Sequence, residues 1–247
     1  MDLLTLDPPK ALIQLKTDGR ALAAAARTVD LTLPIPCCPG WTVRDVVAHT
    51  GEVYSHKLAV LRELATARPE TWEQPPDGGD VVSWFEGQHS ELLAVLRAHD
   101  PATPVWSWYP AEATVGFWCR RMAQETVIHR ADVELATGAP HHVDALVAVD
   151  GIDELLERFL VFDAPADVGG HGETVAVLTP DARWGLTLQA DRIELTRSPG
   201  PADLTIAGTP SHVLYQLWGR LPDDDVDIRG DRAVLVRLRE LLTLTTQ

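Results

Sequence analysis

Three side chains with metal-binding chemistry occur at two separate places in this sequence of 247 residues. His49 lies in the segment WTVRDVVAHTGEVYSHK, while Glu125 and His129 lie four residues apart in the segment FWCRRMAQETVIHRADVE. Imidazole nitrogens and carboxylate oxygens are ligands for divalent metals such as zinc, and a catalytic metal keeps one coordination position open. The chemistry of the chain therefore depends on whether these three side chains meet in the fold.

Helical spacing predicts that two of these ligands lie together. At i and i+4 on a helix, Glu125 and His129 point to one face, about 5–6 Å apart at Cβ. The same face begins with Trp118 and Met122, so we expect it to turn toward the core of a helical bundle. An unpaired carboxylate in a core is unfavourable, and a bound cation is one of the usual remedies.

His49 shares its own helical stripe with apolar Val46 and Val53, which also predicts an inward orientation. His56 follows seven residues after His49 on the same stripe and is either an alternative ligand or a pocket residue. Structural interpretations compete with the metal site. An interior histidine is commonly a hydrogen-bonded core residue, and Glu125 with His129 can form a simple surface pair.

The first part of the chain alternates helical patterns with loops rich in proline and glycine. Thr42 is a predicted N-cap, with Asp45 completing a capping box. Gly138 is expected just beyond the last helix, where the linker begins. Four helices with short or medium connections predict a four-helix bundle over residues 1–140. The predicted helices cover about residues 8–28, 42–68, 79–99 and 115–137.

The pattern changes beyond residue 140, where β-branched residues become frequent. We expect a small α+β domain with an antiparallel sheet over residues 141–247, so the fold class is mixed: an α-helical bundle followed by an α+β domain. Its predicted strands are TVAVLTP, RWGLTLQA, RIELTRS and ADLTIAG, and its predicted helices cover about residues 146–161, 210–219 and 231–244.

The composition limits the possible binding partners and the cellular compartment of the protein. The formal net charge of −15 disfavours binding to nucleic acid or to an anionic membrane surface. No apolar run reaches the roughly 18 residues of a membrane span, and the N-terminus does not resemble a signal peptide. Cys37 and Cys38 are adjacent and Cys119 lies on a helical pattern, which is typical of free thiols in a reducing compartment. We therefore expect a cytoplasmic protein.

Arginine and tryptophan residues are further candidates for substrate contacts. Arg121, one turn before Glu125, would either hold a substrate carboxylate or form a structural ion pair. Arg220 would either reach a substrate at the domain interface or satisfy carbonyls at a helix end. Several of the eight tryptophans flank the loops at the bundle ends, where they would line a pocket for an organic substrate or pack in the core: Trp72, Trp84, Trp106 and Trp108.

The segments PGWTVRDVVAHTGEV (39–53) and RRMAQETVIHRADVELATG (120–138) resemble the maleylpyruvate isomerase family of mycothiol-dependent metalloenzymes, within the DinB-like bundle superfamily. The later segments ADLTIAGTPSHVLYQLWGR and IRGDRAVLVRLREL resemble the second domain of that family, which is similar to a sterol-carrier fold. The resemblance spans nearly the whole chain in order.

The resemblance implies a zinc ion, or another divalent metal, held by His49, Glu125 and His129. Mycothiol or a similar thiol such as ergothioneine would be the cosubstrate, and its metal-bound thiolate would attack a small electrophilic molecule. The outcome is isomerisation if the thiol leaves again and S-transfer if it stays. The alternatives are a zinc hydrolase that activates water and a non-catalytic protein that binds a metal or an apolar ligand. No catalytic residue beyond the metal centre is predicted, and the oligomeric state is left open.

Overall fold

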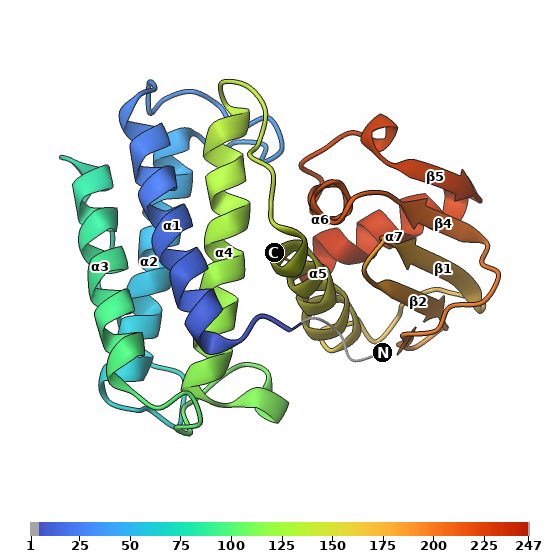
Figure 1. The fold of residues 1–247 in the computed structure, drawn as a ribbon, viewed down its shortest axis with the longest axis horizontal. Coiled ribbons are helices and arrows are strands. Elements are labelled where there is room, and N and C mark those ends of the chain that lie inside the picture. Colours follow the sequence, from blue (N-terminus) through green and yellow to red (C-terminus); the bar gives the residue numbers. More distant parts are fainter. Residues whose placement is uncertain (1–4, 247) are drawn as a thin grey trace. The chain divides into compact units, whose positions relative to one another are not determined.

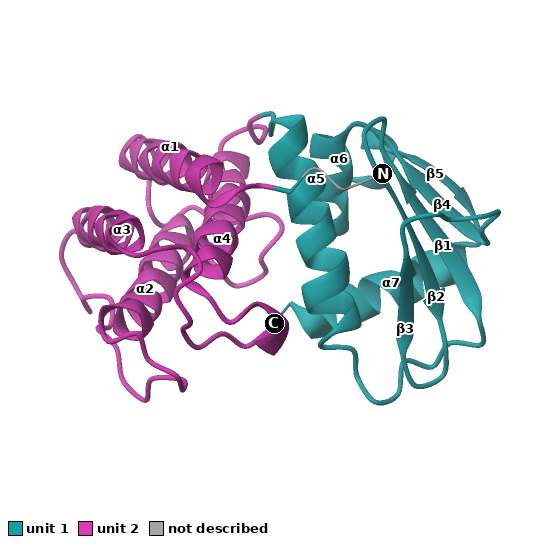
Figure 2. Ribbon diagram, turned by 60° about the horizontal axis from the view of Figure 1, so that its bottom comes forward, with its two compact units in different colours: residues 1–5, 142–247 teal, residues 6–141 magenta. Residues whose placement is uncertain are grey.

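A computed structural model describes residues 5–246, which divide into two compact units. Residues 6–141 form the helical unit, and the second unit contains the chain from His142 onward (Figure 2). Each unit has its own buried apolar core. In the described residues, no helix is both long enough and apolar enough to cross a membrane.

The helical unit is a bundle in which α1 packs mainly on α4 and α2 packs mainly on α3 (Figure 1). α4 also contacts α2 and α3, so it is buried on nearly every side. This central place explains why α4 shows little amphipathic contrast and carries buried polar residues among its apolar ones. The bundle helices of the described chain are α1 (Pro8–Arg27), α2 (Val43–Arg62), α3 (Val81–Ala98) and α4 (Val115–Leu135), with a short 3₁₀ turn η1 (Pro110–Glu112) before α4.

Side-chain caps fix where the two site-bearing helices begin. The hydroxyl of Thr42 accepts from the backbone N–H of Asp45, whose carboxylate accepts from the backbone of Thr42, so the predicted capping box is confirmed. Thr114 caps α4 in the same manner, accepting from the N–H of Phe117. These caps set the helical phase, and therefore the direction in which the later ligand side chains point.

The predicted end of α2 at Arg68 is wrong, because the helix stops at Arg62. Leu64 adopts a left-handed backbone conformation with φ of +47°, and the N–H of Ala65 turns back to the carbonyl of Val60. A non-glycine residue in this region breaks the helical path. Residues 63–80 therefore form a loop that returns across the bundle end, carrying Arg68 and Trp72.

The second unit packs helices against a five-stranded sheet with the order β3-β2-β1-β4-β5 among the described residues. Trp184 in β2 is fully buried and donates to the carboxylate of Asp153 in α5 at 3.0 Å, which ties the sheet to the helical layer. The elements are α5 (Ala145–Glu154), η2 (Leu155–Val161), β1 (Glu173–Leu178), β2 (Arg183–Leu188), β3 (Ile193–Thr196), β4 (Leu204–Ala207), α6 (Pro210–Leu217), η3 (Asp223–Asp225), β5 (Asp227–Gly230) and α7 (Arg232–Thr245).

The mixed fold class is confirmed, with three differences in the second unit. The sheet is mostly antiparallel, but β1 and β4 are parallel because residues 197–203 cross from β3 to the other side of β1. The short polar strand β5 pairs with β4 at the edge and was not predicted. The predicted helix at 146–161 exists, but its second half, η2, is a π-helix.

Candidate metal centre

The three predicted ligand side chains meet between α2 and α4. Their ligand atoms all lie within 4.8 Å of one another. Glu125 Oε1 is 3.5 Å from His49 Nε2 and 3.1 Å from His129 Nε2. The two imidazole rings lie edge to face with centroids 5.0 Å apart. α2 and α4 are separated in the sequence by α3, and together they place two imidazole nitrogens next to one carboxylate oxygen.

Packing around His49 holds its ring on the α4 side of α2. The indole of Trp41, just before the N-cap of α2, contacts the His49 ring edge to face at 5.0 Å. The His49 side chain is still 39% exposed, whereas those of Glu125 and His129 are only 10% and 12% exposed. The cluster is thus closed on the α4 side and open beside His49.

Arg121 binds the oxygen of the Glu125 carboxylate that does not face the two imidazoles. The guanidinium of Arg121, itself buried, forms an ion pair with Glu125 Oε2 one helical turn away. Burial alone would raise the pKa of Glu125, but Arg121 and His129 together hold it well below its ordinary value. Glu125 is therefore an ionised carboxylate with Oε2 engaged by Arg121 and Oε1 facing the two imidazoles.

The hydrogen bond of His129 to Asp132 makes the cluster suitable for a metal. His129 Nδ1 lies 2.9 Å from Oδ2 of the fully buried Asp132, so the neutral ring donates from Nδ1 and leaves a lone pair on Nε2. That lone pair faces Glu125 Oε1 at 3.1 Å, and two acceptors this close require a proton or a cation between them. With a proton there, the neighbouring carboxylates overcome burial and raise the pKa of His129 to about 9.

The spacing also fits zinc. Bonds of about 2.0–2.1 Å in a tetrahedral zinc site imply ligand-to-ligand edges of about 3.3–3.4 Å. The observed separations of 3.5 Å and 3.1 Å, from Glu125 Oε1 to His49 and to His129, lie on either side of that value. The donor set of two nitrogens and one carboxylate oxygen, with an open side at His49, therefore fits a catalytic type of zinc site.

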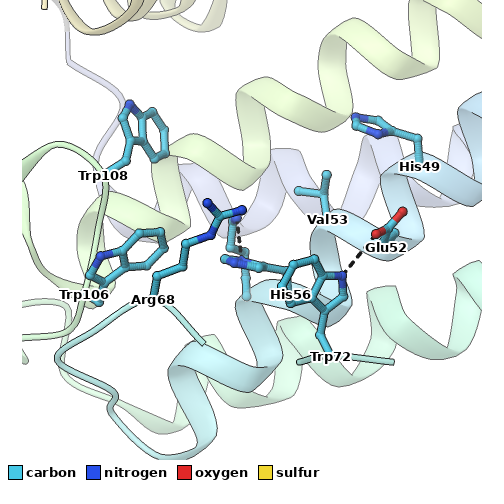
Figure 3. Close-up of a pocket in the computed structure, with 9 residues that line it drawn as sticks. His49, Glu52, Val53, His56, Arg68, Trp72, Trp106 and Trp108 are labelled. Carbon is cyan, nitrogen blue, oxygen red and sulfur yellow. Dashed lines mark hydrogen bonds between the residues drawn. The ribbon is translucent and has the colours of Figure 1, made fainter. Parts of the chain in front are cut away.

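A cavity of about 380 Å³ lies next to the cluster and shares His49 with it (Figure 3). One wall is a continuous stripe of α2 at positions i, i+3, i+4, i+7 and i+8 counted from His49. The other walls are indole rings and a guanidinium from the loops. The lining consists of His49, Glu52, Val53, His56, Lys57, Arg68, Trp72, Trp106 and Trp108.

Lys57 is the most unusual side chain of this cavity. Its Nζ lies 2.8 Å from His56 Nδ1 and 4.6 Å from the centre of the Trp118 ring. Within the described part of the chain, no carboxylate lies within ion-pair distance of this amine. Burial is the main reason that the pKa of Lys57 falls to about 7; the charge of Glu125 opposes this fall, and the charges of Arg121 and Arg68 add to it.

His56 complements Lys57 by remaining neutral. Burial first, and then the charges of Lys57 and Arg68, lower the pKa of His56 to about 4. Its Nδ1 therefore accepts from Lys57 across the physiological pH range. Of the two alternatives for His56, the structure places it as a pocket residue, outside the group that could hold a metal.

The remaining predicted substrate contacts have structural partners. Arg121 pairs with Glu125, Arg220 donates to the carbonyl of Trp218 at 2.7 Å, and Trp84 donates to Glu73 at 2.7 Å. None of these three is among the described residues that line the cavity. The tryptophans that line the cavity are Trp72, Trp106 and Trp108, which the sequence analysis also named as candidates.

Sequence reasoning missed Lys57, Glu52 and Arg68. For the first two a signal was available, because positions 49, 52, 53, 56 and 57 form one helical stripe. That stripe carries one apolar residue, Val53, among four polar ones, which is typical of a cavity wall as much as of a solvated face. Arg68 had no comparable signal, because it was expected inside a helix that in fact ends before it.

Comparisons with known protein families match both units of the chain. A family model described as the mycothiol maleylpyruvate isomerase N-terminal domain matches residues 12–134, and a second, described as the MDMPI C-terminal domain, matches residues 147–237. No curated protein sequence matches the chain significantly.

Solved structures show the same fold. Crystal structures of the mycothiol-dependent maleylpyruvate isomerase and of a histidine-to-alanine mutant of that enzyme align with TM-scores of 0.64 for both. Each alignment covers 92% of this chain and 95% of the other, at 16% identity for the unmutated enzyme and 15% for the mutant. With both domain models matched in order and the fold shared along nearly the whole length, the chain belongs to the mycothiol maleylpyruvate isomerase family of enzymes.

Proposed function

We propose that this protein is a zinc- and thiol-dependent isomerase that uses mycothiol or a closely related thiol. The observation that carries the proposal is that His49, Glu125 and His129 converge and open toward a cavity that shares His49. Family membership supports the thiol and the isomerase reaction. We also propose domain limits of 1–140 for the metal-binding bundle and 141–247 for the sterol-carrier-like α+β domain.

The residues of the cluster would divide the work of holding a metal. His49 and His129 would offer their Nε2 atoms and Glu125 its Oε1. Asp132 fixes the His129 ring, and Arg121 fixes the Glu125 carboxylate. When bound, zinc would lower the pKa of a thiol at the open position, so that the thiol is available as thiolate at neutral pH.

The cavity residues suit the electrophile. In an isomerisation, the thiol adds to a carbon–carbon double bond conjugated with a carbonyl, the resulting single bond rotates, and the thiol leaves again. Negative charge develops transiently on the carbonyl oxygen, where an N–H donor is most effective. Lys57 and the Arg68 guanidinium are donors in the lining of this cavity, and the three indoles reduce the access of water.

Thiol consumption tests the reaction type. We expect the zinc-loaded protein to isomerise maleylpyruvate only when mycothiol is added, with the free thiol concentration unchanged at the end. Loss of free thiol in proportion to product would show S-transfer instead. Turnover of an electrophile without any thiol would indicate the hydrolase, and zinc binding without turnover would indicate a binding protein.

Substitution of a ligand tests the metal centre. We expect His49→Ala and Glu125→Gln each to lose one equivalent of zinc per chain relative to the wild type, measured by elemental analysis, and to lose isomerisation by at least about 100-fold. His99→Ala is the matched control, since this histidine lies at the end of α3 outside the cluster. Full activity of metal-free protein, or of Glu125→Gln, would contradict the proposal.

A further inference from the structure

A second group of metal-binding side chains lies beside the first. Cys37, Cys38 and Asp132 bring their sulfur and oxygen atoms within 4.8 Å of one another. The cysteines come from the loop before α2 and Asp132 comes from α4, 95 residues after Cys37. Neither thiol is engaged in a disulfide, and the Cys37 thiol donates to Asp132 Oδ1 at 3.3 Å.

The loop that carries the cysteines is held by its own hydrogen bonds. The N–H of Ile35 donates to the carbonyl of Trp41, and the N–H of Trp41 donates to the carbonyl of Cys38, at 2.9 and 3.0 Å. The N–H of Cys38 donates in turn to the carbonyl of Ile35 at 3.2 Å. Gly40, with φ of +85°, allows the chain to turn in this small space. Both thiols are therefore presented from an ordered turn, which reduces the entropy lost when a ligand is bound.

Asp132 gives the group a buried negative charge. Its side chain is fully buried, with Oδ2 toward His129 and Oδ1 toward Cys37. A divalent cation bound between the two sulfur atoms and Oδ1 would be attracted by this carboxylate. Cys37 and Cys38 are partly exposed, which gives an ion a path from solvent.

We propose that Cys37, Cys38 and Asp132 form a second cation site, selective for thiophilic divalent ions such as zinc or cadmium. Thiolate ligands favour such ions over magnesium or calcium. Zinc–sulfur bonds of about 2.3 Å imply a sulfur–sulfur edge of about 3.8 Å in a tetrahedral site, so ligands within 4.8 Å need only a small rotation of the cysteine side chains. Binding one divalent ion would release the two thiol protons to solvent.

Ligand chemistry distinguishes this site from the centre at His49. The first centre offers only nitrogen and oxygen, whereas the second offers two sulfurs. Cobalt(II) bound to thiolate gives an intense charge-transfer absorption in the near ultraviolet, which cobalt bound to imidazole and carboxylate does not give. We would titrate the metal-free, full-length protein with cobalt chloride under argon, with a phosphine reductant that keeps the thiols reduced.

We expect the wild-type protein to bind two cobalt ions and to show the sulfur band. Glu125→Gln should keep the band and lose the other ion. The double variant Cys37→Ser/Cys38→Ser should lose the band and keep the other ion. Cys119→Ala is the matched control, because this cysteine is buried within α4 and lies outside the group, so it should retain both ions and the band.

Two outcomes would overturn the second site: a wild-type protein without a sulfur band, or a band that persists in the double variant. A protection experiment covers the case in which the double variant does not fold. Cadmium should slow alkylation of Cys37 and Cys38 in the wild-type protein at least tenfold, as located by mass spectrometry, and unchanged alkylation rates would contradict the site. Zinc binding at the first centre is scored separately by Glu125→Gln, so either site can fail alone.

Discussion

At the scale of single residues, the site depends on polar groups that are buried with specific partners. Asp132 is fully buried and holds the His129 ring, while Arg121 neutralises the far oxygen of Glu125. Lys57 is different, since its amine is buried against His56 and an indole without a carboxylate at ion-pair distance among the described residues. Asp132 and Arg121 hold the metal-ligand side chains in place. Burial lowers the pKa of the Lys57 amine.

Removing the charge of Asp132 should weaken the first metal centre while leaving its three ligands in place. We expect Asp132→Asn to reduce zinc affinity roughly 10–100-fold, because a carboxylate partner raises the basicity of a metal-binding imidazole. Competition with a chromophoric chelator measures the affinity, in the Cys37→Ser/Cys38→Ser background so that zinc binds at the first centre alone. Asp77→Asn, in an exposed loop, should leave it unchanged. Equal affinities for the two variants would show that Asp132 has no such role.

The buried amine of Lys57 should make stability depend on pH. Its pKa of about 7 in the fold lies below the ordinary 10.5, so the unfolded chain holds more protons between these values and stability rises with pH there. The penalty for burying the charge is complete below pH 7 and declines as pH rises toward 10.5.

Lys57→Met removes this penalty. We expect the unfolding free energy of Lys57→Met to exceed that of the wild type. This difference should become smaller by on the order of 2 kcal/mol between pH 6 and pH 9, as measured by urea denaturation at both pH values. Subtracting the two proteins removes the titration of the groups that do not interact with Lys57. A constant difference across this range would mean that Lys57 keeps an ordinary pKa.

At the scale of elements, α2 is the part that joins the cluster to the cavity. It begins at a capping box, presents His49 to α4, and lines the cavity with the following two turns. Its opposite side packs on α3, where the backbone at Gly51 approaches the Trp84 ring. Trp84 therefore positions α2 and does not line the cavity, which separates it from the other candidate tryptophans.

Adding a methyl group at Gly51 should test this packing. A Cβ there would lie 2.3 Å from Cζ3 of Trp84, so Gly51→Ala should push the helices apart and lower the unfolding free energy by about 1–3 kcal/mol. Gly87→Ala in α3 is the control, since no atom lies within 4 Å of its Cβ position. That variant should gain about 0.5–1 kcal/mol, as alanine is the better helix former. Similar unfolding midpoints for both variants would exclude a tight contact at Trp84.

At the scale of the whole molecule, the candidate ligands of both cation sites belong to the helical unit. The second unit has its own core and sheet, and it matches the other domain model of the family. A ligand that binds only the folded state stabilises the unit that holds it. Metal binding should therefore stabilise the helical unit more than the second unit.

Hydrogen exchange should reveal this difference. Zinc at about 100 times its Kd should stabilise the helical unit by about 2.7 kcal/mol and slow the amide exchange of α2 and α4, compared with protein in chelator. Peptides from β1 to β5 should exchange at the same rate in both conditions. Glu125→Gln should show much less protection of the helices. Protection of the sheet alone would place the metal elsewhere.

Much of the fold was predictable because helix signals are local. The capping box at Thr42 and the helical spacing of Glu125 and His129 both depend on residues within one or two turns. The early end of α2, the π-helical half of the segment 146–161 and the polar edge strand β5 were not predictable in this way. All three depend on tertiary context. Leu64 has a left-handed backbone conformation, the π-helical half packs on the sheet, and β5 needs β4 as a partner.

The amino-acid sequence alone determined the kinds of ligand and their arrangement on each helix, because 3.6 residues per turn fixes which side chains share a face. Only the tertiary structure decided that His49 meets Glu125, that Asp132 supports His129 and accepts a hydrogen bond from Cys37, and that three loop tryptophans line the same cavity as Lys57. The distance between two helices is set by how their side chains pack, and that packing involves residues far apart in the chain.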